Sequence, residues 1–148
     1  MMAELITTDR DQAFTLWLGV LRDPKSEKMC GALAHHFHTD QRCCLGHACH
    51  ALGEERALVK EYGVLGVGHV AYGPEKEIHT LPDRVARLLN LTCEGEFKAL
   101  VVVGGAEFDT LSDLNDASNL TPAEIADVIE DMWKNDGFVP YAEDEYDD

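Results

Sequence analysis

The chain has 148 residues, and its 28 acidic and 12 basic side chains give a formal net charge of −16. This length favours one domain with a single core, and the strong negative charge argues against nucleic acid or anionic membranes as ligands because both repel a polyanion. No apolar run approaches the roughly 20 residues that span a bilayer, and an odd number of cysteines, five, without an export signal predicts a reducing cytoplasm and no disulfide framework.

The first predicted element is a helix over residues 9–21. Thr8 and Asp11 can cap it, and Pro24 ends it because proline disfavours helix in the residue before it. Its apolar side chains recur at spacings of three and four residues, as on a core-facing surface: Phe14, Trp17, Leu18 and Leu21. Three further segments carry weaker signals: a strand over residues 29–37, a surface loop or helical turn over residues 54–63, and a strand over residues 63–72.

Two helices and one strand are predicted in the second half of the chain. A helix is expected over residues 83–91, and the apolar run at residues 97–103 is typical of a strand, which the two glycines after it end. The last helix begins at Thr121, which forms a capping box with Glu124 around a proline at the first helical position. Its apolar face consists of Ile125, Val128, Ile129, Met132 and Trp133.

These elements predict an α+β fold, with three or four helices packed on a small, mainly antiparallel sheet. We expect one compact domain over residues 1–140. Five of the last eight residues are acidic, and a like-charged terminal run is typical of a solvated, disordered tail, here residues 141–148.

Reactive side chains are most concentrated in a helix predicted over residues 42–52, with Asp40 as its N-cap and Gly53 as its left-handed stop. At about 100° per residue this helix has two faces. The apolar face consists of Cys44, Leu45, Ala48, Cys49, Ala51 and Leu52, and the polar face of Cys43, His47, His50 and Glu54. Because free cysteine behaves as a small hydrophobic residue, we expect Cys44 and Cys49 to be buried and unreactive.

Residues 43–46 (CCLG), 114–116 (LND) and 123–130 (AEIADVIE) are the most specific parts of a pattern that covers most of residues 14–133. In this pattern the chain resembles a family of small uncharacterised proteins from bacteriophages and actinobacteria. The resemblance implies a small cytoplasmic protein of the kind that phages encode, and it brings no established activity. The family pattern has an aliphatic residue in place of His47 and lacks the run HHFH at residues 35–38, so chemistry based on these histidines would be particular to this chain.

The cysteines and histidines between residues 35 and 50 are candidate metal ligands. Zinc prefers the nitrogen and sulfur donors of these side chains. Cys43, His47 and His50 follow helical spacing, and His36 or His38 could complete a tetrahedron. The paired CxxC spacing of common zinc sites is absent from this segment. Surface histidines and core cysteines are therefore the favoured interpretation, and we expect no cofactor, with zinc as the alternative.

Cys43 is also a candidate nucleophile. A thiol in the first turn of a helix is stabilised as the thiolate by the helix dipole, and Arg42 adds positive charge. His69 and His79 are the downstream candidates for a general base. The arrangement is similar to that of papain-like and cell-wall peptidase folds, but neither family's signature surrounds this cysteine. An unreactive thiol is therefore the favoured interpretation.

Residues 113–124 resemble a calcium-binding loop only in part. Asp113, Asn115 and Glu124 stand at ligand positions, but the ligand at the fifth position and the turn glycine at the sixth are missing. The favoured interpretation places Asn115 and Asp116 in a turn between two helices, where each side chain bonds its own backbone.

No complete catalytic constellation emerges from these motifs. We therefore expect a small acidic cytoplasmic protein, in the host cytoplasm if a phage encodes it, that is not an enzyme and acts by binding a partner protein with a basic surface. The alternative is a module centred on residues 43–50: a hydrolase-like enzyme using Cys43, His69 and His79, or a zinc-binding module using Cys43, His47, His50 and His38.

Overall fold

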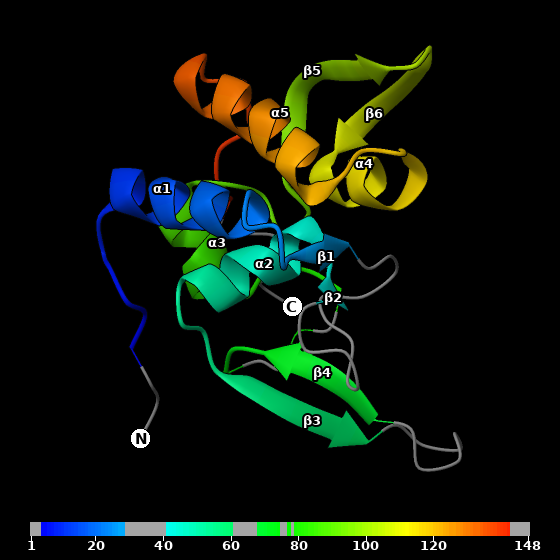
Figure 1. Ribbon diagram of the computed structural model, residues 1–148. Helices are drawn as coiled ribbons and strands as arrows, with labels where there is room; N and C mark the ends of the chain where they lie inside the picture. Colours follow the sequence, from blue (N-terminus) through cyan, green and yellow to red (C-terminus); the bar gives the residue numbers. More distant parts are fainter. Residues whose placement is uncertain (1–3, 29–40, 61–67, 75–76, 78, 143–148) are drawn as a thin grey trace.

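The computed structural model describes residues 4–28, 41–60, 68–74, 77 and 79–142, which form five helices and six strands (Figure 1). The strand predicted over residues 29–37 lies outside this part of the chain. The helices are α1 (Arg10–Leu21), α2 (Cys44–Ala51), α3 (Asp83–Leu89), α4 (Leu111–Ala117) and α5 (Pro122–Lys134). The strands are β1 (Glu27–Lys28), β2 (Gln41–Arg42), β3 (Arg56–Lys60), β4 (Gly68–Tyr72), β5 (Glu96–Val103) and β6 (Ala106–Thr110).

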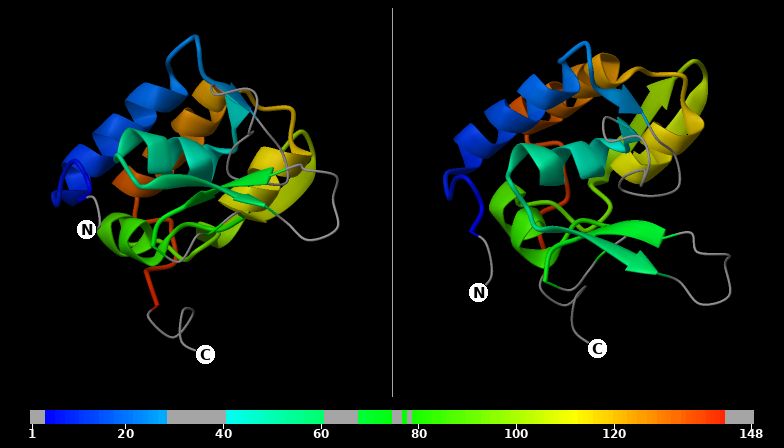
Figure 2. Two further views of the ribbon diagram at one scale, coloured as in Figure 1. Left: turned by 90° about the horizontal axis from the view of Figure 1, so that it is seen from below. Right: turned by 60° about the horizontal axis from the view of Figure 1, so that its bottom comes forward.

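The described strands pair two by two and do not form one sheet. β1 and β2 are parallel, whereas β3 with β4 and β5 with β6 are antiparallel. The two antiparallel pairs lie on opposite sides of helices α1, α2 and α3 (Figure 1 and Figure 2). The predicted α+β class is confirmed. The correction is that helices occupy the centre of the molecule and separate the strand pairs.

α1 is central to the helix packing, because it contacts α2, α3 and α5. Its N-cap is Asp9 and not the predicted Thr8: the Asp9 carboxylate accepts from the Gln12 backbone N at 2.9 Å. This three-residue separation is the one at which an N-cap side chain reaches a free amide. The side chains predicted to face the core are buried: Phe14, Trp17, Leu18 and Leu21.

α5 begins as predicted. Thr121 Oγ1 accepts from the Glu124 backbone N at 3.2 Å, and Glu124 Oε1 accepts from the Thr121 backbone N at 3.0 Å, which completes the capping box. The Trp133 ring of α5 stacks on Phe14 of α1, with ring centroids 4.9 Å apart. α5 is the longest described helix, with 13 residues.

None of the helices in the described ranges is both long and apolar enough to cross a membrane.

Two regions differ from the prediction because long-range pairing determines their structure. Residues 56–60, which belong to the segment predicted as a loop or helical turn, form β3, in which Leu58 lies opposite Val70 of β4. The two glycines end β5 at Val103, as predicted, and they also turn the chain into β6, a strand that was not predicted; α4 follows at once. Strand propensity depends on such cross-strand partners, which a local pattern does not include.

The end of the described chain is anchored to α3. The Tyr141 backbone N donates to Asn90 Oδ1 at 3.1 Å, and the Tyr141 hydroxyl donates to Asp83. The Arg87 guanidinium lies over the Tyr141 ring, 5.4 Å from its centroid. Packing therefore continues through the first residue of the predicted tail, and residues 143–148 lie outside the described part of the chain.

Candidate functional site

The cysteine-containing helix α2 begins later than predicted. Its N-cap is Cys43, whose sulfur accepts from the Gly46 backbone N at 3.4 Å. The predicted cap, Asp40, lies outside the described residues and is three positions too early for this helix. Gly53 follows the last turn with φ 71°, as predicted, in a conformation that glycine adopts without strain.

The predicted apolar face of α2 is confirmed, but its predicted polar face is wrong. All six residues assigned to the core side are buried. Of the four residues assigned to solvent, Cys43, His47 and Glu54 are buried, and only His50 is exposed. The physical reason is that α1 and α4 both pack on this short helix, and the segment of β1 reaches its third side. A helix covered in this way belongs to the core.

Two segments of the family-like pattern meet at the start of α2. Asn115 of α4 is fully buried, and its Oδ1 accepts from the Cys44 backbone N at 3.0 Å. The Cys44 thiol donates to the Leu111 carbonyl oxygen at 3.6 Å, and Trp17 Nε1 donates to the Cys44 carbonyl oxygen at 2.8 Å. The prediction of a turn at Asn115 is therefore wrong: this side chain lies within a helix and bonds a backbone amide 71 residues away.

The predicted metal ligands are not assembled in the described part of the chain. His47 Nε2 lies 2.8 Å from the Glu27 carbonyl oxygen, which orients the ring toward β1, and His50 is exposed. His36 and His38 lie outside the described residues. Among the described residues, no group of three His, Cys, Asp or Glu side chains is placed to hold a metal ion. Two of the three candidate ligands of the calcium-like segment, Asn115 and Glu124, serve as helix caps.

The hypothesis of a Cys43 nucleophile stays a prediction, and the structure adds the surroundings of its parts. Cys43 is only 7% exposed, so a substrate would have to reach a buried thiol. Arg42 is buried too and lies close to Tyr72. Burial raises the pKa of Tyr72, and the hydrogen bond and the charge of Arg42 partly offset this increase. His69 lies in β4 at the register position opposite Val59, and His79 is exposed in the segment before α3.

Cys44 and Cys49 are expected to resist alkylation in the folded protein. Burial raises the pKa of both thiols well above the ordinary value of 9.0, so at pH 8 each holds less thiolate than an exposed cysteine. With iodoacetamide, both should react at least about a hundredfold more slowly than the half-buried Cys93, because reaction requires an opening of the structure. Mass spectrometry of the cysteine-containing peptides measures the three rates. In denaturant the rates should converge, and similar rates in the native protein would contradict the burial of this helix.

A buried ion pair fixes the C-terminal end of α2 to α3. The Glu54 side chain is 0% exposed and that of Arg84 is 24% exposed. Arg84 Nε donates to Glu54 Oε2 at 2.8 Å, and Arg84 Nη2 donates to Oε1. The Glu55 backbone N donates to the same carboxylate at 2.8 Å. With both oxygens bonded, Glu54 has a structural role.

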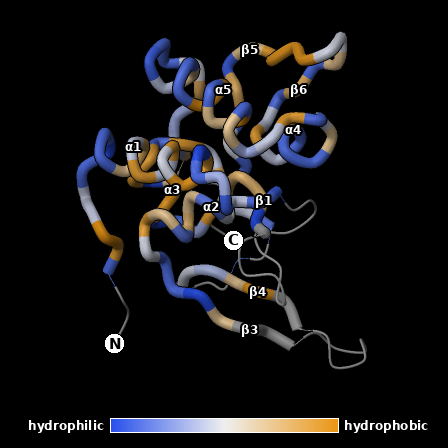
Figure 3. The backbone as a smooth tube through the Cα atoms, in the orientation of Figure 1, coloured by the Kyte–Doolittle hydropathy of each residue, from blue (hydrophilic) through white to orange (hydrophobic). Residues whose placement is uncertain are grey.

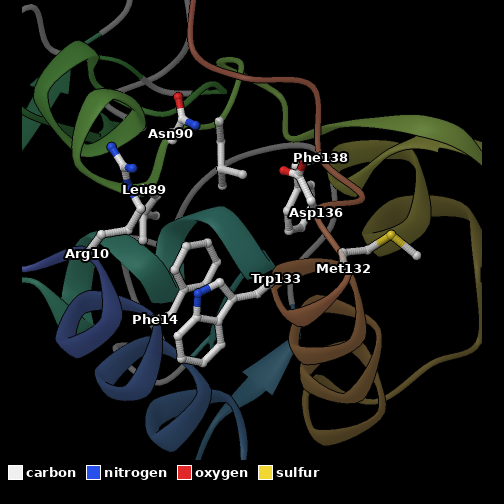
Figure 4. A pocket seen from close by; sticks show the side chains of 9 residues that line it. Arg10, Phe14, Leu89, Asn90, Met132, Trp133, Asp136 and Phe138 are labelled. Atoms are coloured by element: carbon white, nitrogen blue, oxygen red, sulfur yellow. The ribbon is translucent and has the colours of Figure 1, made fainter.

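Two pockets open beside these helices, and the arginines that line them already have partners. One of about 160 Å³ lies between the start of α1 and the C-terminal ends of α3 and α5 (Figure 4). Phe14 and Trp133 stack within it, and Arg10 Nε donates to a backbone carbonyl of α3 at 2.7 Å. The other, about 450 Å³, lies between the N-terminal segment and α3, where Arg84 is paired with Glu54. Neither pocket indicates a particular ligand.

The β5–β6 hairpin carries exposed apolar side chains next to carboxylates. Leu100 is 54% exposed and Val102 is 64% exposed. Glu107 stands directly opposite Val102 in the register of the two strands, and Asp109 and Asp113 are also exposed. We call these five residues the hairpin face. Apolar side chains bordered by polar ones are typical of surfaces that bind other proteins.

The negative charge of the hairpin face is not balanced nearby. Residues 99–133 contain eight acidic residues and no lysine, arginine or histidine. Arg22 and Lys134 pair with carboxylates of α5, but in the described part of the chain no ion pair involves the three acids of the hairpin face. The pKa of Asp113 is raised, chiefly because its carboxyl group shares a hydrogen bond with that of Asp109. Two carboxylates this close favour a cationic partner.

The hairpin face is not among the sites predicted from the sequence, although two local signals indicate it. A glycine pair between two extended segments is a hairpin signal, and here Gly104 and Gly105 have φ of 58° and 86°. The base-free run of residues 99–133 marks where the negative charge concentrates. Comparison with known proteins adds no family to these observations: no family model, no curated protein and no solved structure matches the chain.

Proposed function

We propose that this protein acts by binding a partner protein with a basic surface, and that the hairpin face makes the contact. The observation that carries the proposal is the juxtaposition of exposed Leu100 and Val102 with the unbalanced carboxylates of Glu107, Asp109 and Asp113. Burying the apolar side chains would provide affinity, and the carboxylates would select a basic partner and speed its association.

The proposal assigns structural roles to the residues that first suggested chemistry. Cys44 and Asn115 join α2 to α4, and Glu54 with Arg84 joins α2 to α3. The net charge of −16 favours a basic protein over nucleic acid or an anionic membrane. We also propose a cytoplasmic location, of the host cell if the gene belongs to a phage. Its support is that Cys44 and Cys49 are free thiols in the core, as is usual in reducing compartments.

Site-specific photo-crosslinking tests this proposal. A photo-reactive amino acid in place of Val102 should capture a basic protein from an extract of the organism that encodes the chain. The same group in place of Glu27, which is exposed on β1, is the matched control and should not capture it. Equal capture from both positions, or capture of an acidic protein, would contradict the assignment of the hairpin face.

Charge reversal separates local from overall electrostatics. The double substitution Glu107→Lys and Asp109→Lys should weaken capture by at least about tenfold, because it reverses the charge at the contact. The double substitution Glu4→Lys and Glu27→Lys changes the net charge by the same amount at exposed positions elsewhere, and it should have a much smaller effect. Equal losses from the two variants would mean that the overall charge of the protein, and not the hairpin face, attracts the partner.

A further inference from the structure

The outer edge of β5 carries backbone N–H and C=O groups that can form hydrogen bonds with another chain, in addition to its exposed side chains. The chain turns from β5 to β6 through two glycines, with Val103 paired to Ala106, Val102 to Glu107 and Val101 to Phe108. In an antiparallel hairpin, pairs that exchange both backbone hydrogen bonds alternate with pairs that exchange none. The pair next to a two-residue turn is of the first kind. The N–H and C=O of Val102 therefore point away from β6.

The same strand is covered at its start and open at its end. Lys98 N donates to the Gly137 carbonyl oxygen at 2.8 Å, and Val139 N donates to the Glu96 carbonyl oxygen at 2.9 Å. A register shift follows between Glu96 and Val101, where β5 bends (Figure 1). Beyond this bend, no other segment of the described chain forms a backbone hydrogen bond with the outer edge at residues 99–103.

This open edge lacks the features that usually protect an edge strand. Edge strands of monomeric proteins are commonly blunted by charged side chains, by proline or by a covering segment. Residues 99–103 have the sequence ALVVV, with no charge and no proline, and Leu100 and Val102 are more than half exposed. Figure 3 shows this hydrophobic stretch on β5, away from the helical centre. Such an edge is suited to accept a strand from another chain.

We propose that an extended segment of the partner adds to the open edge of β5 as a further strand, with apolar and basic side chains alternating along the one face of the segment that continues the hairpin face. This inference rests on the proposed function and names the element that the partner supplies. Main-chain bonds would form at Val102, and the apolar side chains of the segment would pack on Leu100 and Val102. Basic side chains on the same face would extend over Val102 toward Glu107 and Asp109, which carry the unbalanced charge.

Charge complementarity favours this occupant over a second copy of the chain. Pairing two β5 edges would place the Glu107 and Asp109 carboxylates of both copies on one continuous sheet face. Each copy also carries a net charge of −16. Like charges on one sheet face destabilise it, whereas lysine or arginine from a partner strand would compensate the same carboxylates.

Binding of short synthetic peptides to the full chain tests the inference. The probe is a peptide in which valine and lysine alternate at every second position, on one face of the strand, with threonine at the positions between. Its affinity is measured by fluorescence anisotropy in low salt. We expect N-methylation of every second backbone amide, on the edge that faces β5, to weaken binding by at least about tenfold, because it blocks strand pairing and keeps the charge. The substitution Val102→Pro should cause a similar loss, and Val102→Thr, which keeps the amide, should not.

The outcomes distinguish this inference from the proposed function. If the N-methylated peptide binds as tightly as the parent peptide, and a glutamate–valine peptide does not bind, strand addition is wrong and the basic-partner proposal stands. If the glutamate–valine peptide binds equally well, the basic character of the partner is wrong. Analytical ultracentrifugation that shows a dimer of the wild type, lost in Val102→Pro, would assign the edge to a second copy and overturn the inference. The N-methylated peptide keeps the test valid if Val102→Pro fails to fold.

Discussion

Replacing Asn115 by alanine should lower the free energy of unfolding by about 2–4 kcal/mol. The Asn115 side chain is fully buried, and its Oδ1 is the acceptor for the Cys44 backbone N at 3.0 Å. Without it, a buried amide at the start of α2 has no acceptor from α4, and a cavity forms between the two helices. Urea unfolding measures the loss, and hydrogen exchange at Cys44 reports the amide directly.

The matched control for Asn115 is its neighbour. Asp116→Ala removes the exposed carboxylate that accepts from Asn115 Nδ2 at 2.9 Å, but it leaves the bond to Cys44 in place. We expect a loss of no more than about 1 kcal/mol for this variant. If the two variants lose equal stability, or if Cys44 exchanges at the wild-type rate in Asn115→Ala, the cap between α4 and α2 is not a main determinant of stability.

Replacing Arg84 by methionine should cost about 3 kcal/mol of stability at neutral pH. Glu54 has a fully buried side chain, and Arg84 is its bidentate partner. The variant leaves a buried carboxylate without its compensating charge, and this is the circumstance in which breaking an ion pair is most destabilising. The cost is placed at the lower end of the usual range because Arg84 is 24% exposed, so water can approach the site. Thermal and urea unfolding both measure it.

Arg87 provides the control on the same helix. It pairs with Asp83 at 3.1 Å, but its side chain is 60% exposed, and exposed ion pairs contribute about 0–1 kcal/mol. Arg87→Met should therefore cost no more than about 1 kcal/mol. The double variant Glu54→Gln with Arg84→Met should recover part of the loss of Arg84→Met, because it removes the unpaired charge. A double variant less stable than Arg84→Met would contradict the ion-pair explanation.

The reactive side chains of residues 43–49 lie in the interior of this protein, and the surface suited to binding consists of other residues. The cysteines of residues 43–49 and His47 attract attention as possible ligands or nucleophiles, yet in the structure they lie in the core with Asn115 and Trp17. The hairpin face, by contrast, carries exposed apolar side chains and carboxylates without ion-pair partners in the described part of the chain, although its residues are of common types. Binding experiments aimed at β5 and β6 are therefore more informative than assays for metal or thiol chemistry.

The sequence by itself determined the elements that depend on neighbouring residues. The apolar spacing of α1, the capping box of α5 and the glycine stop after α2 are local devices, in which a side chain and its partner lie a few residues apart. The apolar stripe of α2 was also predictable, because helical periodicity places Cys44, Leu45 and Cys49 on one side. The α+β class followed from these elements and from the valine-rich strand.

Only the tertiary structure decided which faces are covered and which edges stay open. Periodicity assigned His47 and Glu54 to solvent, but both are buried. α1 and α4 pack on α2, β1 contacts His47, and Arg84 of α3 pairs with Glu54, so burial depends on elements distant in sequence. For the same reason Asn115 serves a helix 71 residues away. The open edge of β5 exists because segment 137–139 pairs only with the start of that strand, and no local pattern specifies how far a distant segment extends along it.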